Sequence, residues 1–115
     1  EFGGSSLNAT LRDYARIGLF ALRNGRLRNG DTVLPDGWMA ESITPSPRNA
    51  EYGYLWWLNG DGAYSAAGIF GQGIYISPSE DLVIALHSAR KHASRPEDWV
   101  LQNALYKAID KALSD

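Results

Sequence analysis

Hydrophobic residues recur at the spacing of one helical face between positions 11 and 22, and the arginines lie mostly off that face. Thr10 and Asp13 form the pattern of a capping box, whose side chains satisfy free N–H groups in the first turn of a helix. Asn24 and Gly25 follow, and glycine takes the left-handed conformation that ends many helices. The pattern therefore predicts an amphipathic helix that begins near Thr10 and ends at Asn24.

The next residues predict short elements and a boundary. Asn29–Gly30 suits a tight turn, so a hairpin of two very short strands is expected around it. Pro35 suits the first turn of a short helix that continues through positions 38–43. The proline-rich segment 44–49 is a loop and the best internal boundary. Residues 1–49 are thus expected to form a mainly helical part.

Residues 50–115 change character and predict a sheet followed by a helix. Aromatic and β-branched residues gather in four candidate strands, with turn signals between them, at positions 52–58, 63–69, 71–76 and 82–87. Short connections imply an antiparallel meander, since parallel neighbours need long crossovers. Ser94 and Glu97 form a second capping-box pattern. The expected helix carries one apolar face that can cover the sheet, made of Leu101, Ala104, Leu105, Ala108, Ile109 and Ala112.

These elements define the expected fold class as α+β, of the α/β sandwich type. An antiparallel meander of three to four strands packs against the C-terminal helix, with an N-terminal helix and a short hairpin before it. A length of 115 residues suits one domain.

The composition of the chain excludes several kinds of partner and of catalytic site. A net charge of −2 creates no field that would recruit nucleic acid or a membrane surface, so neither is an expected partner. The chain has no cysteine, which removes disulfides, thiol catalysis and thiolate metal sites. His87 and His92 have no carboxylates at metal-binding spacing, so no metal and no cofactor is expected. The sequence gives no indication of the compartment.

The segment AAGIFGQGIYIS, positions 66–77, is the best candidate for chemistry. Gly68, Gly71 and Gly73 interrupt an apolar and aromatic run. Glycine within a strand marks a bulge or a place where another group approaches the backbone closely. One hypothesis is an oxyanion hole, in which a main-chain N–H meets developing negative charge. The alternative is a bulge or a tight crossing against the helix that begins near Ser94.

Three segments together carry a family resemblance: GGSSLNATLRDYARIG, LPDGWMAES and YGYLWWLNGDGAYSAAGIFGQGIYISPSEDLVIALHS, followed by a terminal helix. They resemble the C-terminal part of serine hydrolases of the class C β-lactamase and penicillin-binding-protein-like superfamily. Within it, the nearest likeness is to the esterase and 6-aminohexanoate-dimer hydrolase branch. The resemblance covers nearly the whole chain.

The resemblance implies roles for individual residues. In that family a K-[ST]-G strand forms one wall of the site and gives an oxyanion-hole N–H. Ala66, Ala67 and Gly68 occupy these positions here, so Ile69 would give the N–H. Gly68 would then belong to the catalytic strand, while Ala66, Ala67 and Phe70 would contact substrate. The family's lysine is absent from this motif, which fits an amidase or esterase better than a true β-lactamase.

The family's nucleophile is the missing part. Its serine and lysine lie in an S-x-x-K helix start, and a tyrosine lies in a Y-x-N motif, both before the region seen here. Ser88 and Lys91 spell S-x-x-K, but Ser88 ends an expected strand, and the next helix signal begins at Ser94. No Y-x-N follows any tyrosine. The resemblance therefore implies that residues 1–115 are one C-terminal fragment, inactive alone.

Two functions stay open. The first is part of a serine hydrolase whose complete form acts on a small amide or ester through an acyl-enzyme. The second is a non-catalytic module that binds through its aromatic sheet, although Trp56 and Trp57 are adjacent in a strand and point to opposite faces. A fragment would expose strand 82–87 as an edge. That edge is expected to bind the missing N-terminal half in trans or to self-associate.

Overall fold

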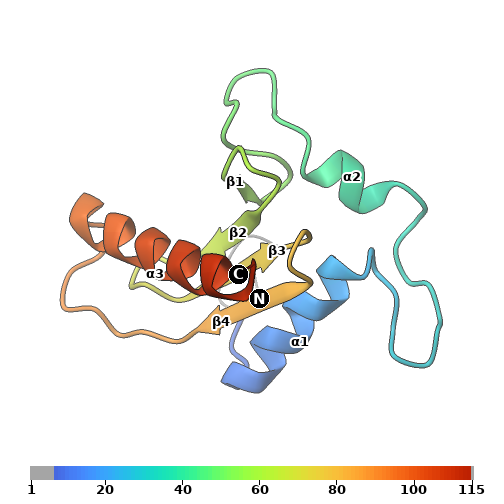
Figure 1. Cartoon of the computed structure of the whole chain (residues 1–115), viewed down its shortest axis with the longest axis horizontal. Coiled ribbons are helices and arrows are strands. Elements are labelled where there is room, and N and C mark those ends of the chain that lie inside the picture. The colour runs from blue at the N-terminus through green and yellow to red at the C-terminus, as the bar shows by residue number, and fades with distance from the viewer. Residues whose placement is uncertain (1–6, 115) are drawn as a thin grey trace.

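The computed structural model describes residues 7–114 and contains one antiparallel sheet with three helices (Figure 1). Residues 3–6, which begin the first segment of the resemblance, lie outside this range. The four strands of the sheet lie side by side in chain order and pair antiparallel, so the predicted meander and the α+β class are confirmed. The elements are α1 (Leu11–Leu22), α2 (Trp38–Ser42), β1 (Trp57–Leu58), β2 (Tyr64–Ala67), β3 (Gly73–Ser77), β4 (Leu82–Leu86) and α3 (Pro96–Ser114).

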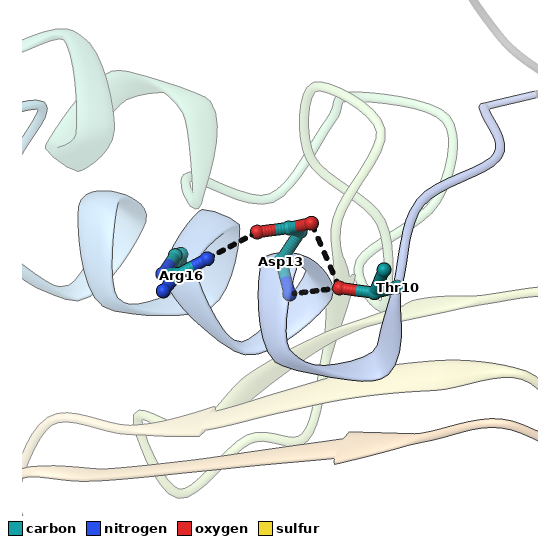
Figure 2. A network of polar contacts seen from close by, with 3 residues as sticks. All are labelled: Thr10, Asp13 and Arg16. Carbon is teal, nitrogen blue, oxygen red and sulfur yellow. Dashed lines mark hydrogen bonds and ion pairs between the residues drawn. The ribbon is translucent and has the colours of Figure 1, made fainter.

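Helix α1 begins where the capping pattern predicted. The Thr10 hydroxyl accepts from the Asp13 N–H at 3.2 Å and donates to the Asp13 carboxylate at 2.7 Å (Figure 2). Arg16 donates to the other carboxylate oxygen at 2.5 Å. The Thr10 hydrogen bond, followed by the Arg16 contacts, holds the pKa of Asp13 below its ordinary value. The cap is therefore a local arrangement of residues three apart.

Helix α1 packs closely on β3 and β4 because Gly18 has no side chain. A Cβ at Gly18 would lie 2.5 Å from Val83 Cγ1 and 2.9 Å from Ile74 Cγ2. In Figure 1, α1 runs beside β4. The core on this face of the sheet consists of Ala21, Met39, Tyr64, Ile74 and Ile76.

Helix α3 covers the opposite face, where alternate strand residues point. Tyr75 and Tyr106 stack there with ring centroids 4.9 Å apart, and they form a second core with Ala63. The predicted apolar face of α3 is wrong in most of its positions. Gln102 and Tyr106 are the buried residues of α3, whereas Leu101 is 69% exposed and Leu105 is 47% exposed. The helix is rotated because its polar groups find partners in the sheet and in the segment before it.

Several predicted boundaries are also corrected. Only Trp57–Leu58 of the predicted strand 52–58 forms a strand, because Leu55 has a left-handed backbone with φ 65°. The predicted hairpin around Asn29–Gly30 is reduced to one antiparallel bridge between Arg26 and Thr32. Local turns therefore replace extended structure at both places.

The predicted starts of α2 and α3 also shift. Pro35 lies before α2, and Trp38 donates its N–H to the Pro35 carbonyl at 3.1 Å. Ser94, with φ 51°, does not cap α3, which begins at Pro96. No helix in residues 7–114 is long and apolar enough to cross a membrane.

Candidate functional site

The candidate site lies at the hairpin connection 68–72 between β2 and β3. The sequence predicted strands over 63–69 and 71–76, with Phe70 alone between them, but β2 ends at Ala67 and β3 begins at Gly73. Gly68 donates its N–H to the Gln72 carbonyl at 2.8 Å, and Gly71 donates to the Gly68 carbonyl at 2.9 Å. Gly71 has φ 91°, a backbone conformation that favours glycine. The connection is thus a closed turn, with Ile69 and Phe70 at its tip.

The segment after β4 holds the two carbonyls at the tip. The Ile69 carbonyl accepts from the Ser94 N–H at 2.8 Å, and the Phe70 carbonyl accepts from the Arg90 N–H at 3.2 Å. The Phe70 N–H donates to the Gln72 side chain at 3.2 Å. These bonds fix the backbone on both sides of Ile69.

The Ile69 N–H makes no hydrogen bond with any residue in the range 7–114. Ile69 is 59% exposed as a residue. The N–H of Gly68 is already used within the turn. Of these two neighbouring N–H groups, only that of Ile69 has no hydrogen-bond partner within residues 7–114.

The other expected substrate contacts are partly brought together. Ala66 and Ala67 pair with Ile74 and Gly73 of β3, whereas β1 pairs only with the earlier part of β2. Ala66, Ala67, Gly68 and Ile69 line a groove of 980 Å³ on the α1 side of the sheet. Phe70 is 39% exposed at the turn and does not line this groove. A ligand in this part of the groove would meet the small side chains of Ala66 and Ala67.

Ser88 and Lys91 do not form a catalytic helix start. Ser88 lies in an irregular segment after β4, and the following helix begins only at Pro96. A lysine three residues after a serine reaches its hydroxyl only when both lie on one helical turn. His87, beside Ser88, packs its ring edge-on against Tyr14 at 5.0 Å. Within residues 7–114, no group of three or more histidines and carboxylates could hold a metal.

A series of hydrogen-bonded and stacked polar side chains, called the polar chain below, lies next to the turn. Its members come from β3, from α3 and from the segment between β4 and α3. Arg90 donates to Gln102 at 2.5 Å, and Gln102 donates to the Tyr106 hydroxyl at 2.7 Å. Tyr75, stacked on Tyr106, donates to Asp110 at 2.8 Å. Burial, and then the Asp110 carboxylate, raises the pKa of Tyr75, and burial also raises the pKa of Tyr106. Both phenols therefore stay protonated and can act as donors at neutral pH.

This polar chain explains two of the three glycines. A Cβ at Gly71 would lie 2.7 Å from Arg90 Cζ, and a Cβ at Gly73 would lie 2.7 Å from Gln102 Nε2 and closer still to the Tyr106 hydroxyl. The alternative of a tight crossing is thus confirmed at Gly73, where α3 crosses, and the segment before α3 crowds Gly71. Sequence analysis missed Arg90 and Gln102, because nothing local in the sequence places them next to the turn.

Comparisons with known proteins bear on this arrangement. The sequence model of the Beta-lactamase family matches residues 2–107. The 6-aminohexanoate-dimer hydrolase of Paenarthrobacter ureafaciens is 27% identical over an alignment of 127 residues, which covers 97% of this chain and 32% of that protein. The solved structure of a Bacillus anthracis protein described as a 6-aminohexanoate-dimer hydrolase matches with a TM-score of 0.78 and 32% identity, covering 95% of this chain and 30% of that one. The chain spans about a third of the length of these two relatives.

Proposed function

Because this chain belongs to the beta-lactamase family, we propose that it is the C-terminal part of a serine amidase or esterase and supplies one donor of the oxyanion hole. The observation that carries the proposal is the Ile69 N–H, which makes no hydrogen bond within residues 7–114 and belongs to a residue that is more than half exposed. The whole of residues 1–115 forms one portion of the enzyme. The serine, lysine and tyrosine of the reaction come from the part of the protein that the chain does not span.

In this reaction a serine hydroxyl oxygen attacks the substrate carbonyl carbon while a base takes the hydroxyl proton. The carbonyl oxygen becomes an oxyanion and accepts a hydrogen bond from the Ile69 N–H. The amine or alcohol then leaves with a proton, an acyl-enzyme remains, and water hydrolyses it. One oxyanion donor contributes roughly 10²–10³ in rate. The chain alone lacks the nucleophile and its base and has no turnover.

The relatives and the groove support a proposal for the substrate class. A small linear amide, of the kind that the name 6-aminohexanoate dimer describes, is the first substrate to test. Ala66 and Ala67 leave room beside β2. Phe70 is half-exposed at the turn and lies outside the groove, so it would contact only a part of the substrate that extends past Ile69.

The second function, a binding module that uses the aromatic sheet, has less support. Tyr64 and Tyr75 are 3% and 1% exposed, and Trp56 packs edge-on against Tyr64 at 5.1 Å. Trp57 is 45% exposed, but it packs against Tyr52. Most of the sheet's aromatic surface is therefore used inside the protein. Assaying amide hydrolysis by the chain with and without a supplied N-terminal half separates the two functions.

The donor is tested by two substitutions in a complete enzyme that carries this chain. Ile69→Pro removes the N–H and should lower kcat on the order of 100-fold, whereas Ile69→Ala keeps the N–H and should retain most of the rate. Circular dichroism checks that both variants fold. Equal small losses in two folded variants would remove Ile69 from the mechanism.

A further inference from the structure

Arg90, which follows β4 in the chain, contacts the connection 68–72 through both its backbone and its side chain. Its backbone N–H donates to the Phe70 carbonyl at 3.2 Å, and its guanidinium lies directly against Gly71. We propose that Arg90 is a positioning residue that fixes this turn and thereby aims the Ile69 N–H. The structural part of the proposal stands on these contacts, and its catalytic consequence rests on the proposed function.

The guanidinium is itself held in place by α3. It donates to Gln102 at 2.5 Å and lies over the Trp99 ring, 5.3 Å from the ring centroid. Gln102 is 4% exposed, and its amide donates to the buried Tyr106 hydroxyl. A planar cation fits this place because it stacks on an aromatic ring and donates along its edge at the same time. Arg90 therefore joins the turn to α3.

The link from Arg90 to the Ile69 N–H passes through one peptide plane. Gly71, which the guanidinium covers, donates its N–H to the Gly68 carbonyl at 2.9 Å. That carbonyl and the Ile69 N–H belong to the same planar peptide group and point in opposite directions. Fixing Gly71 thus fixes the direction of the Ile69 N–H. A Cβ at Gly71 would lie 2.7 Å from Arg90 Cζ, so the turn and the arginine fit only with glycine here.

The position of Arg90 carries a free-energy cost, which indicates that a contribution to stability alone does not explain why an arginine lies here. Its Nη1 is buried and has no hydrogen-bond partner within residues 7–114. A buried donor left without a partner costs roughly 1–3 kcal/mol. Local costs of this kind are expected where a residue serves a site.

The first test is amide hydrogen exchange in the 115-residue chain, which needs no catalytic activity. Arg90→Met should speed exchange of the Gly71 and Gly68 amides about tenfold or more, because the turn opens locally, while the β3 and β4 amides change little. Lys91→Met removes a neighbouring exposed cation and is the matched control. Arg90→Lys keeps the charge and serves as the milder variant if Arg90→Met unfolds. Unchanged turn amides in folded Arg90→Met or Arg90→Lys would overturn the proposal.

The second test measures kinetics in a complete enzyme that carries this chain. Arg90→Met should lower kcat about tenfold or more with little change in KM, and Arg90→Lys should restore only part of it. In an Ile69→Pro background, Arg90→Met should cost nothing further, because the donor it aims is gone. A harmless Ile69→Pro alongside faster turn exchange in Arg90→Met would reject the proposed function and keep the structural role of Arg90. An equal cost of Arg90→Met in both backgrounds would reject its action through Ile69.

Discussion

Gly73 gives the sharpest test of how α3 packs on the sheet, because side chains of α3 occupy the space above its α-carbon. A Cβ added there would lie 2.7 Å from Gln102 Nε2 and closer still to the Tyr106 hydroxyl. Ordinary carbon contacts lie at about 3.5–4.0 Å. Tyr106 is 2% exposed and stacks on Tyr75, so its ring has no room to swing away. Gly73→Ala must therefore displace Tyr106 or α3.

The expected magnitude follows from opposing effects. Replacing glycine by alanine in a strand favours folding by roughly 0.5–1 kcal/mol. Overpacking a filled interior costs about 1–3 kcal/mol, and disturbing the hydrogen bond from Gln102 to Tyr106 adds about 1 kcal/mol. Gly73→Ala should thus lower the free energy of unfolding by about 1–3 kcal/mol.

Tyr106→Phe separates this clash from other effects. It removes the hydroxyl nearest the new Cβ, so Gly73→Ala should cost at least about 1 kcal/mol less in the Tyr106→Phe background than in the natural chain. Urea unfolding of the four proteins, followed by circular dichroism, measures the difference. Tyr64→Phe, the same change on the other face of the sheet, is the control and should be additive with Gly73→Ala. If the cost of Gly73→Ala in the Tyr106→Phe background agrees within about 0.5 kcal/mol with its cost in the natural chain, the packing argument is refuted.

The remaining predictions concern the cap, alkaline pH, Ser88 and the sheet edge. Thr10→Ala should cost about 1 kcal/mol by removing the N-cap of α1. It should also raise the pKa of Asp13 toward its ordinary value, and an unchanged carboxyl titration by NMR would contradict this. Burial raises the pKa of Tyr64 to about 12, so its contribution to stability is complete below pH 10 and is lost as the pH rises through 12. Tyr64→Phe should lose less stability over that alkaline range than the natural chain, and an equal loss in urea unfolding would count against this cause. A fluorophosphonate probe should not label the isolated chain, and stoichiometric labelling of Ser88 would show a nucleophile where none is expected. The chain should self-associate through the β4 edge in sedimentation at rising concentration, and Leu86→Lys should reduce this, whereas a chain that stays monomeric throughout would show that the edge does not pair.

The sequence predicts α1 and the order of the strands because their signals are local. Thr10 caps α1 through residues only three positions away, and the apolar stripe of α1 matches the face that packs on β3 and β4. Turn residues between the strands force an antiparallel meander whatever the exact strand ends. These features depend on neighbours in the sequence, so one sequence is enough to find them.

The rotation of α3 could not be predicted, because its cause lies far away in the sequence. Hydrophobic periodicity favours burial of Leu101 and Leu105, but the structure buries Gln102 and Tyr106 instead. A buried glutamine is stable only when its amide is satisfied, and here both of its polar atoms are bonded, one of them to Arg90. The arginine lies twelve residues before Gln102 in an irregular segment. Periodicity ranks helix positions by hydropathy and contains no information about such a partner.

The glycine motif shows how the two sequence hypotheses combine. Gly71 and Gly73 make room for Arg90 and for the Gln102–Tyr106 pair, so these glycines are explained by packing and do not require a ligand. The candidate oxyanion donor is therefore reduced to one peptide, between Gly68 and Ile69, which sequence analysis expected only through the family resemblance. Gly71 and Gly73 still affect that donor, because the side chains packed against these glycines hold the turn that contains the Ile69 N–H. A substitution at Gly73 that displaces Gln102 should consequently also shift the Ile69 N–H, because Gln102 holds Arg90, which lies against Gly71 in the same turn.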